Sequence, residues 1–133
     1  MNDFRHTALT DAILCCFYTV YNTLGCGFLE KVYENSLREE LNSRGYTATS
    51  QHSVEVVYKD KVVGQYYADL LVDDKVIVEI KAVSTLLPEH EAQLLNYLKG
   101  TGKNVGLLLN FGPQPQVRRK VYSESNKHNA DQI

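Results

Sequence analysis

An acidic residue and a Glu-x-Lys sequence stand ten positions apart in a strongly apolar part of the chain. Asp69 follows Tyr67-Ala68, and Glu79 and Lys81 lie within residues 76–83, which read Val-Ile-Val-Glu-Ile-Lys-Ala-Val. This run of β-branched residues predicts a buried strand, and Glu79 and Lys81 share one face of it because they are two residues apart. A buried carboxylate and a buried ammonium are costly unless they are paired, hydrogen-bonded or bound to a metal. The pattern therefore predicts an ion pair, a hydrogen-bonded network or a metal site.

Asp69 joins this pair in only one register of a hairpin. The polar residues 73–75, Asp-Asp-Lys, separate two apolar runs and predict the turn. A two-residue turn places Asp69 opposite Val78, on the wrong face, whereas a three-residue loop over 73–75 places it opposite Glu79. The three-residue loop is favoured because it leaves the other face wholly apolar, although a bulge achieves the same separation. That apolar face consists of Ala68, Leu70, Val72, Val76, Val78 and Ile80.

Two predicted helices carry further polar side chains near this strand pair. Glu30 borders the apolar stripe of a helix over residues 28–43 and lies in its first turn. It either stabilises the helix dipole or provides a third carboxylate directed at the sheet. On the helix that follows the strands, His90, Gln93 and Tyr97 share one face. This polar stripe is either solvated or lines a cleft beside the strand that carries the Glu-x-Lys sequence.

Hydrophobic periodicity predicts an α/β (α+β) fold with a mixed sheet. The order ααβββαβ(β) gives four to five central strands flanked by helices, and the third helix allows its flanking strands to run parallel. The continuous apolar run 105–110 predicts a central strand. The predicted helices span residues 7–24, 28–43 and 88–98, the middle one with a core-facing stripe of Leu29, Val32, Tyr33, Leu37 and Leu41. The predicted strands span residues 53–58, 62–72, 76–83, 105–110 and 117–122.

The composition is that of an ordinary globular protein. The chain has 133 residues, of which 44% are hydrophobic and 23% charged, enough for one core. We expect one domain over residues 1–122 and a flexible tail over 123–133. A net charge of -2 gives no general attraction to nucleic acid, so such binding must rely on local patches.

Several classes of protein are excluded by missing signals. Cys15, Cys16 and Cys26 lack zinc-ligand spacing and indicate reduced, structural residues of a cytoplasmic protein. The apolar stretch 12–20 is too short to span a bilayer and lacks the flanks of a secretory signal. The sequence contains no phosphate-binding GxxxxGK[ST] loop, no complete dinucleotide-binding glycine motif and no GxSxG nucleophile motif.

Two sets of residues resemble known families. Residues 27–33, Gly-Phe-Leu-Glu-Lys-Val-Tyr, match the pattern of the GxxExxY family of small bacterial and archaeal proteins. Asp69 with Glu79-Ile80-Lys81, followed by Gln93-x-x-x-Tyr97, resembles the active-site pattern of the PD-(D/E)XK nuclease superfamily, in the branch with a QxxxY motif. Ala68 stands where the superfamily name has proline. The likeness covers roughly residues 9–122 and implies a restriction-endonuclease-like core.

By this resemblance, the site is that of a metal-dependent hydrolase. The implied cofactor is Mg²⁺, for which Mn²⁺ can substitute, and Mg²⁺ prefers hard oxygen ligands and retains waters. Lys81 would orient or help to deprotonate the attacking water. The implied metal ligands are Glu30, Asp69, Glu79 and the backbone carbonyl of Ile80. The residues expected to bind substrate or to support the site are Tyr33, His90, Gln93 and Tyr97.

Two functions are compatible with these residues. The first is an Mg²⁺-dependent nuclease that hydrolyses phosphodiester bonds, with DNA favoured as substrate, RNA not excluded, no membrane partner, and a homodimer or partner protein assisting. The alternative is a non-catalytic nuclease-fold module that works in a larger complex. A catalytic site requires the carboxylates to converge on one cation, whereas a module predicts a Glu30 that points elsewhere or a Lys81 closed in a dry ion pair. The candidate phosphate-binding cations are Lys31, Lys99, Lys103, Arg118, Arg119 and Lys120.

Overall fold

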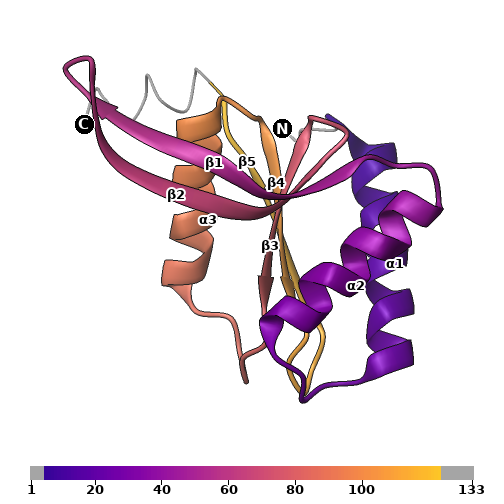
Figure 1. The fold of residues 1–133 in the computed structure, drawn as a ribbon. Coiled ribbons are helices and arrows are strands. Elements are labelled where there is room, and N and C mark those ends of the chain that lie inside the picture. Colours follow the sequence, from indigo (N-terminus) through magenta and orange to yellow (C-terminus); the bar gives the residue numbers. More distant parts are fainter. Residues whose placement is uncertain (1–4, 124–133) are drawn as a thin grey trace.

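The structure, a computed structural model, describes residues 5–123 as a five-stranded sheet with three helices packed on it (Figure 1). The predicted tail over residues 123–133 lies, apart from residue 123, outside the described residues. The helices are α1 (Thr7–Leu24), α2 (Glu30–Ser43) and α3 (Pro88–Thr101). The strands are β1 (Ala48–Tyr58), β2 (Lys61–Val72), β3 (Val76–Lys81), β4 (Val105–Asn110) and β5 (Gln116–Val121).

The sheet is mixed, which confirms the predicted fold class. Its strand order is β1-β2-β3-β4-β5. Strands β3 and β4 pair in parallel through the α3 crossover, and the other neighbours are antiparallel. Strand β4 is paired on both sides and completely buried, as its continuous apolar sequence predicts.

The register of the β2–β3 hairpin follows the three-residue loop. Val72 pairs with Val76, Leu71 with Ile77 and Leu70 with Val78, so residues 73–75 form the loop. The two loop aspartates have φ angles of 51° and 58°, in the left-handed region that aspartate tolerates better than most residues. One member of the predicted apolar face is misplaced, because Ala68 packs in the cluster on the α3 side rather than with Leu70. The strands part beyond Leu70, so strict alternation with β3 ends there.

Three boundaries differ from the predictions for physical reasons. Strand β1 begins at Ala48, five residues earlier than predicted, because pairing with β2 holds a polar segment that shows no apolar alternation. Helix α2 begins at Glu30, since Leu29 has the extended conformation of an N-cap. Helix α3 continues through Gly100 to Thr101. The remaining predicted ends agree within about two residues, the normal uncertainty of helix and strand assignment.

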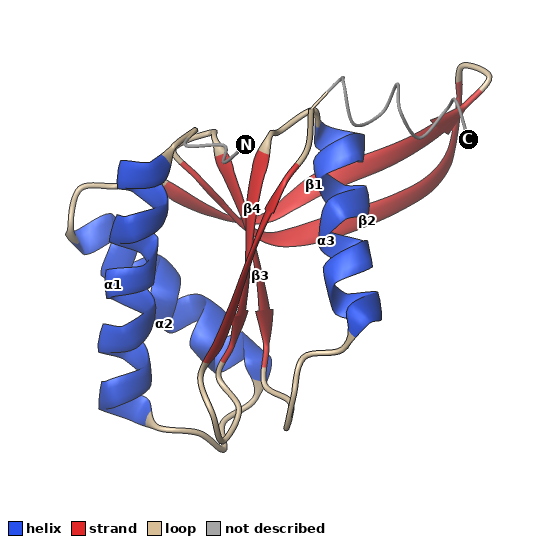
Figure 2. Cartoon of the chain, turned by 180° about the vertical axis from the view of Figure 1, so that it is seen from behind, coloured by secondary structure: helices blue, strands red, loops and turns tan. Residues whose placement is uncertain are grey.

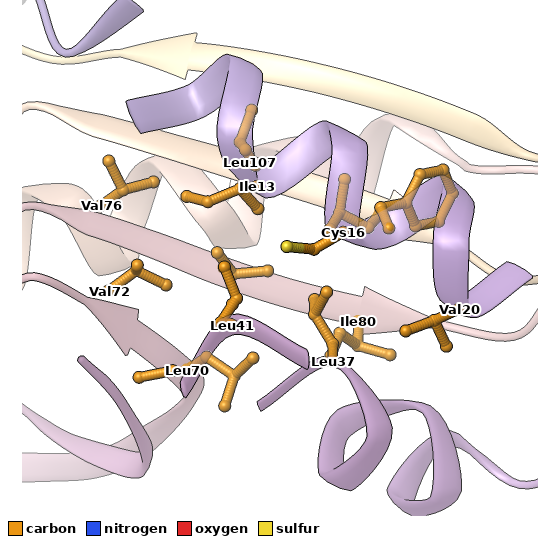
Figure 3. Close-up of a cluster of buried hydrophobic side chains, with 14 of the residues drawn as sticks. Ile13, Cys16, Val20, Leu37, Leu41, Leu70, Val72, Val76, Ile80 and Leu107 are labelled. Carbon is orange, nitrogen blue, oxygen red and sulfur yellow. The ribbon is translucent and has the colours of Figure 1, made fainter. Parts of the chain in front are cut away.

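The core has one layer on each face of the sheet. Helices α1 and α2 cover one face and α3 covers the other, as Figures 1 and 2 show from opposite sides. Figure 3 shows the first layer, in which Ile13 and Cys16 of α1 and Leu37 of α2 face apolar residues of the sheet such as Leu70 and Ile80. The second layer joins α3 to the same strands through their other face, and its largest members include Ile77, Leu94, Leu98 and Leu108.

The predicted core-facing stripe of α2 is wrong at two positions. Leu29 and Val32 were predicted to belong to the core-facing stripe of α2, but their side chains are 80% and 37% exposed. Their places toward the interior are taken in part by Glu34, which is only 4% exposed. Cys15 is also exposed, whereas Cys16 packs in the core as a small hydrophobe. None of the described helices is long and apolar enough to cross a membrane.

Candidate active site where two strands part

Strands β2 and β3 separate at Asp69 and Glu79, and carboxylates fill the gap. The backbone N–H of Asp69 donates to Oε1 of Glu79 at 3.0 Å, and the backbone N–H of Ile80 donates to Oδ2 of Asp69 at 2.8 Å. Side chains thus satisfy backbone groups whose ladder partners are missing. We call Asp69, Glu79 and Ile80 the fork. The N–H and C=O of one strand residue point to the same neighbouring strand, so the carbonyl of Ile80 faces the same gap.

The two fork carboxylates resist ionisation together. Burial raises the pKa of Glu79 to about 9, and the adjacent charge of Asp69 adds to the shift. Burial also raises the pKa of Asp69 to about 6, although the hydrogen bond from Ile80 acts in the opposite direction. Two buried carboxylates in contact need a proton or a cation between them to offset their repulsion. The fork is therefore an electrostatically unsatisfied, negatively charged site at high pH.

Lys81 provides the nearest positive charge from the sheet. It lies two residues after Glu79 on β3 and is half-buried, and its charge lowers the pKa of both fork carboxylates. Within residues 5–123, its ammonium forms no ion pair shorter than 4.0 Å. The ammonium therefore stays near the fork without being locked to either carboxylate, which leaves it available to a substrate or a water.

The end of β3 is fixed by a buried amide on β4. Asn110 is completely buried, and its side chain accepts a hydrogen bond from the N–H of Val83 and donates one to the carbonyl of Val83. Gly112 allows this close approach, because a Cβ at that position would collide with the carbonyl oxygen of Val83. The segment that follows Lys81 is thereby held against β4, which restricts the backbone from which Lys81 projects.

Helix α2 faces the fork with two carboxylates rather than one. Glu30 is the first residue of the helix and is exposed, whereas Glu34, one turn later, is buried. Both negative charges raise the pKa of Asp69, and Glu34 has the larger effect. Glu34 accepts hydrogen bonds from Lys31 at 2.7 Å and Gln51 at 3.1 Å. Sequence reasoning missed Glu34, although its four-residue spacing from Glu30 places both on one helix face.

Helix α3 approaches the fork from the opposite face of the sheet. The side-chain amide of Gln93 donates to the hydroxyl of Tyr97 at 3.0 Å, so the two predicted partners are in contact. Burial raises the pKa of Tyr97, and the charges of Glu79 and Asp69 raise it further. The Tyr97 hydroxyl therefore lies within electrostatic reach of the fork. His90 is half-buried, and its Nδ1 accepts the N–H of Leu87, a capping bond that leaves Nε2 for other partners.

Tyr33 supports the loop that leads into α2. Its ring is completely buried and stacks on Phe111 with centroids 4.4 Å apart. Its hydroxyl donates to the carbonyl of Gly25 at 2.6 Å and accepts the N–H of Phe28 at 3.2 Å. Gly27 lies within this loop with a φ of 112°, a conformation that other residues rarely adopt. Tyr33 thus fixes the position at which α2 begins and hence the direction of its acidic face.

Replacement of Tyr33 by phenylalanine is expected to destabilise the protein by about 1–2 kcal/mol, because the half-buried carbonyl of Gly25 and the backbone N–H of Phe28 lose their partner. Thermal unfolding of Tyr33→Phe measures the change. Tyr18→Phe serves as the control, since Tyr18 is 44% exposed on α1. An equal effect of both substitutions would contradict the supporting role of the Tyr33 hydroxyl.

The donor set of the fork suits a hard divalent cation. Two carboxylates and one backbone carbonyl meet at the gap, and Mg²⁺ in proteins is usually held by one or two carboxylates while waters complete its octahedron. The raised pKa values of both carboxylates also indicate a site that lacks positive charge. Glu30 does not complete a three-carboxylate set, because residues 5–123 contain no group of three or more His, Cys, Asp or Glu side chains placed to hold a metal ion.

Comparison with protein families identifies the superfamily of this chain. The model of the PD-(D/E)XK nuclease superfamily matches residues 7–121, which include every element of the fold. The chain belongs to this superfamily. In this PD-(D/E)XK protein, Asp69 and Glu79 of the fork and the neighbouring Lys81 follow one another in the order of the superfamily pattern, with Ala68 in place of the proline. No curated protein sequence matches the chain.

Solved structures resemble this PD-(D/E)XK protein in fold. The crystal structure of SSO0001 has a TM-score of 0.54 and 19% sequence identity, over 77% of this chain and 54% of that one. An alkaline exonuclease (LHK-Exo) from Laribacter hongkongensis has a TM-score of 0.49 and 16% identity, over 74% of this chain and 61% of its own. The chain therefore spans less than two thirds of either protein. At such identities the first of these likenesses shows the fold alone.

Proposed function

We propose that this protein is a divalent-metal-dependent nuclease whose active site is the fork. The observation that carries the proposal is the hydrogen-bonded pair of carboxylates at the separating strands, the buried Glu79 and the half-buried Asp69, with Lys81 beside them and outside any ion pair in the described part of the chain. A purely structural acidic pair is better satisfied by a direct ion pair with the nearby lysine. Membership of the superfamily supports the same chemistry.

Each fork residue has a distinct task in this proposal. Asp69 and Glu79 each use one oxygen for a backbone N–H, so their other oxygens and the Ile80 carbonyl are the ligands offered to Mg²⁺ or Mn²⁺. When bound, the metal supplies positive charge that acidifies a water molecule and offsets charge on the phosphate. Lys81 orients the attacking water and stabilises the negative charge that develops during hydrolysis. Gln93 and Tyr97 position the phosphate from the α3 side, and His90 lies at the entry to that side.

Helix α2 contributes the second acidic element. Glu30 lies at the exposed start of the helix and Glu34 is buried one turn later. We propose that Glu30 meets the metal through water rather than directly, since the carboxylates of α2 do not form a metal-holding group with the fork. The Gly27–Tyr33 pattern, in which the Tyr33 hydroxyl holds the preceding loop and the helix begins at Glu30, also supports assignment to the GxxExxY family.

The proposal is tested by cleavage of labelled single- and double-stranded DNA and RNA with Mg²⁺, Mn²⁺ or EDTA. We expect metal-dependent cleavage of at least one substrate, with DNA favoured. Calorimetry supplies an independent measurement, in which Mg²⁺ or Mn²⁺ binds the wild type and binds Asp69→Asn at least about tenfold more weakly. Exposed Glu39→Gln on α2 is the matched control and should bind metal as the wild type does. Absence of both cleavage and metal binding would favour the non-catalytic nuclease-fold module.

A further inference from the structure

A groove runs between α3 and the distal part of the β1–β2 hairpin. In Figures 1 and 2 this hairpin extends past the body of the sheet on the side of α3. The groove has a volume of about 960 Å³, the upper end of the range typical of ligand sites. Polar and aromatic side chains along it include Tyr66, His90, Gln93, Asn96, Tyr97 and Lys99.

Tyr97 connects this groove with the proposed active site. Tyr97 lines the groove, and its hydroxyl responds to the charges of Glu79 and Asp69 in the fork. The ring of Tyr66 lies opposite on β2, with its centroid 6.2 Å from that of Tyr97 at an interplanar angle of 38°. Tyr66 is 51% exposed, so much of its ring is open to an incoming planar group. A molecule held in the groove therefore lies beside Tyr66 and Tyr97, the second of which we assign above to the substrate phosphate.

The charges of the molecule do not favour a duplex backbone as the main contact. Among the cations that the sequence suggests for phosphate contacts, Lys31 is paired with Glu34 and Lys103 with Asp74. The cations of β5 are similarly engaged, since Lys120 lies 2.7 Å and Arg118 3.9 Å from carboxylate oxygens of Glu91. Such ion pairs reduce the positive charge available to phosphates, which supply most of the non-specific affinity for duplex DNA.

Lys99 differs from those cations. It lines the groove and forms no ion pair with any residue between 5 and 123. The other charged residues of the groove are Glu55 and Glu89, so the groove as a whole has no positive excess. Open aromatic rings beside side-chain amides and one lysine suit the faces and edges of nucleobases better than a polyphosphate surface.

We propose that this groove binds unpaired nucleobases of a single-stranded nucleic acid, with one base stacked on Tyr66 and Lys99 at a phosphate. This inference rests on the proposed nuclease function and names its substrate class, a single strand or a single-stranded end. Bases in a duplex are stacked on their neighbours and expose no face to a tyrosine, so the groove discriminates by strandedness rather than by sequence. Aromatic stacking tolerates all bases because each has a π face.

The test is the affinity of Tyr66→Ala for a labelled 12-nucleotide oligo-dT or oligo-rU strand, measured by fluorescence anisotropy. EDTA keeps the strand intact, and a parallel titration contains Mg²⁺. We expect Tyr66→Ala to weaken binding at least about fivefold, the effect of losing one base–aromatic stack. Tyr66→Phe retains the ring and should bind as the wild type does. Tyr18→Ala removes a similarly exposed tyrosine from α1 and is the matched control.

An abasic strand of the same length separates base stacking from phosphate contacts. The abasic strand keeps the phosphates but offers no base to stack. The wild type should therefore bind it more weakly than it binds the normal strand, whereas Tyr66→Ala should bind the two strands with similar affinity. The effects of removing the bases and of removing the Tyr66 ring are then non-additive. Comparison of the affinities for oligo-dT and oligo-rU shows whether the groove prefers single-stranded DNA or RNA. Wild-type affinity that is equal for duplex and single strand, or unchanged by Tyr66→Ala, would overturn the proposal, as would failure to bind either strand.

These results are distinguishable from failure of the nuclease proposal. Cleavage and metal binding report on the fork, whereas anisotropy in EDTA reports on the groove alone. If the protein binds single strands through Tyr66 but cuts no substrate, the groove proposal stands and the nuclease proposal is wrong. If the protein cuts duplex and single strands equally well, and Tyr66→Ala does not change the affinity for a single strand, the nuclease proposal stands and the groove proposal is wrong.

Discussion

Replacement of Lys81 by alanine is expected to reduce the rate of metal-dependent cleavage by at least about 10³-fold, within the range for loss of a positioned general acid–base or charge-stabilising group. Lys81 is the charged group of β3 that lies beside the fork and outside any ion pair in the described part of the chain. The measurement is single-turnover cleavage of the preferred substrate at saturating protein, which isolates the chemical step from binding.

The control for Lys81→Ala is Lys75→Ala. Lys75 lies in the loop of the same hairpin and is exposed. Its replacement by alanine should leave the cleavage rate within about twofold of wild type, since surface substitutions have small effects. Circular dichroism and thermal unfolding establish that both variants fold. A folded Lys81→Ala protein with a wild-type single-turnover rate would refute the role of this lysine.

Replacement of Glu79 by glutamine is expected to stabilise the metal-free protein at pH 8 while it abolishes cleavage. Glutamine keeps the acceptor for the Asp69 N–H and offers an N–H to the Asp69 carboxylate, but carries no charge. It therefore removes the repulsion within the fork. The expected gain is at least about 1.4 kcal/mol, the free energy of one pKa unit, or about 4 °C in the midpoint of thermal unfolding.

The sign of the pH dependence follows from the direction of the two pKa shifts. Both fork carboxyls have a higher pKa in the folded protein than in the unfolded chain, about 6 against 3.8 for Asp69 and about 9 against 4.5 for Glu79. The folded state therefore binds more protons, and the free energy of unfolding falls as pH rises from about 4 toward 9. Metal binding should reverse this loss, so Mg²⁺ or Mn²⁺ stabilises the wild type more at pH 8 than at pH 5.

Thermal unfolding of wild type and Glu79→Gln between pH 5 and pH 9 in EDTA measures this effect as a difference between two proteins. The advantage of Glu79→Gln should grow with pH across the range. Hydrogen bonds from Lys103 and Lys120 are the chief cause of the lowered pKa values of Asp74 and Glu91, respectively. These two carboxylates lose their stabilising charge only in acid, below the pH range of the measurement. Glu39→Gln on the exposed face of α2 should give no such growth. A stability difference that is constant or reversed with pH would show that the fork carboxylates are already neutralised by other means.

Local sequence patterns determined the fold class and much of the fork. The limits of α1 follow from the period of its apolar residues, and those of β4 follow from its continuous apolar run. The register of β2 and β3 follows from the separation of polar and apolar faces around residues 73–75. These predictions succeed because alternation and turn chemistry act between residues close in sequence. The same reasoning placed Asp69 opposite Glu79, where the structure has them hydrogen-bonded to the two strands.

Only the tertiary structure determined which polar groups meet across elements. The burial of Glu34 depends on Gln51, a residue of β1 with a φ of 56° that no periodic pattern identifies. The point at which β2 separates from β3 is likewise set by the assembled sheet, since pairing ends at Leu70 and Ala68 packs on the α3 side. The engagement of Lys103 and Lys120 in ion pairs likewise depends on residues 29 positions distant in sequence, Asp74 and Glu91. Periodicity determines which side chains of a helix or strand share its core-facing side. Contacts between side chains of different elements follow from how the elements pack, which local sequence patterns do not encode.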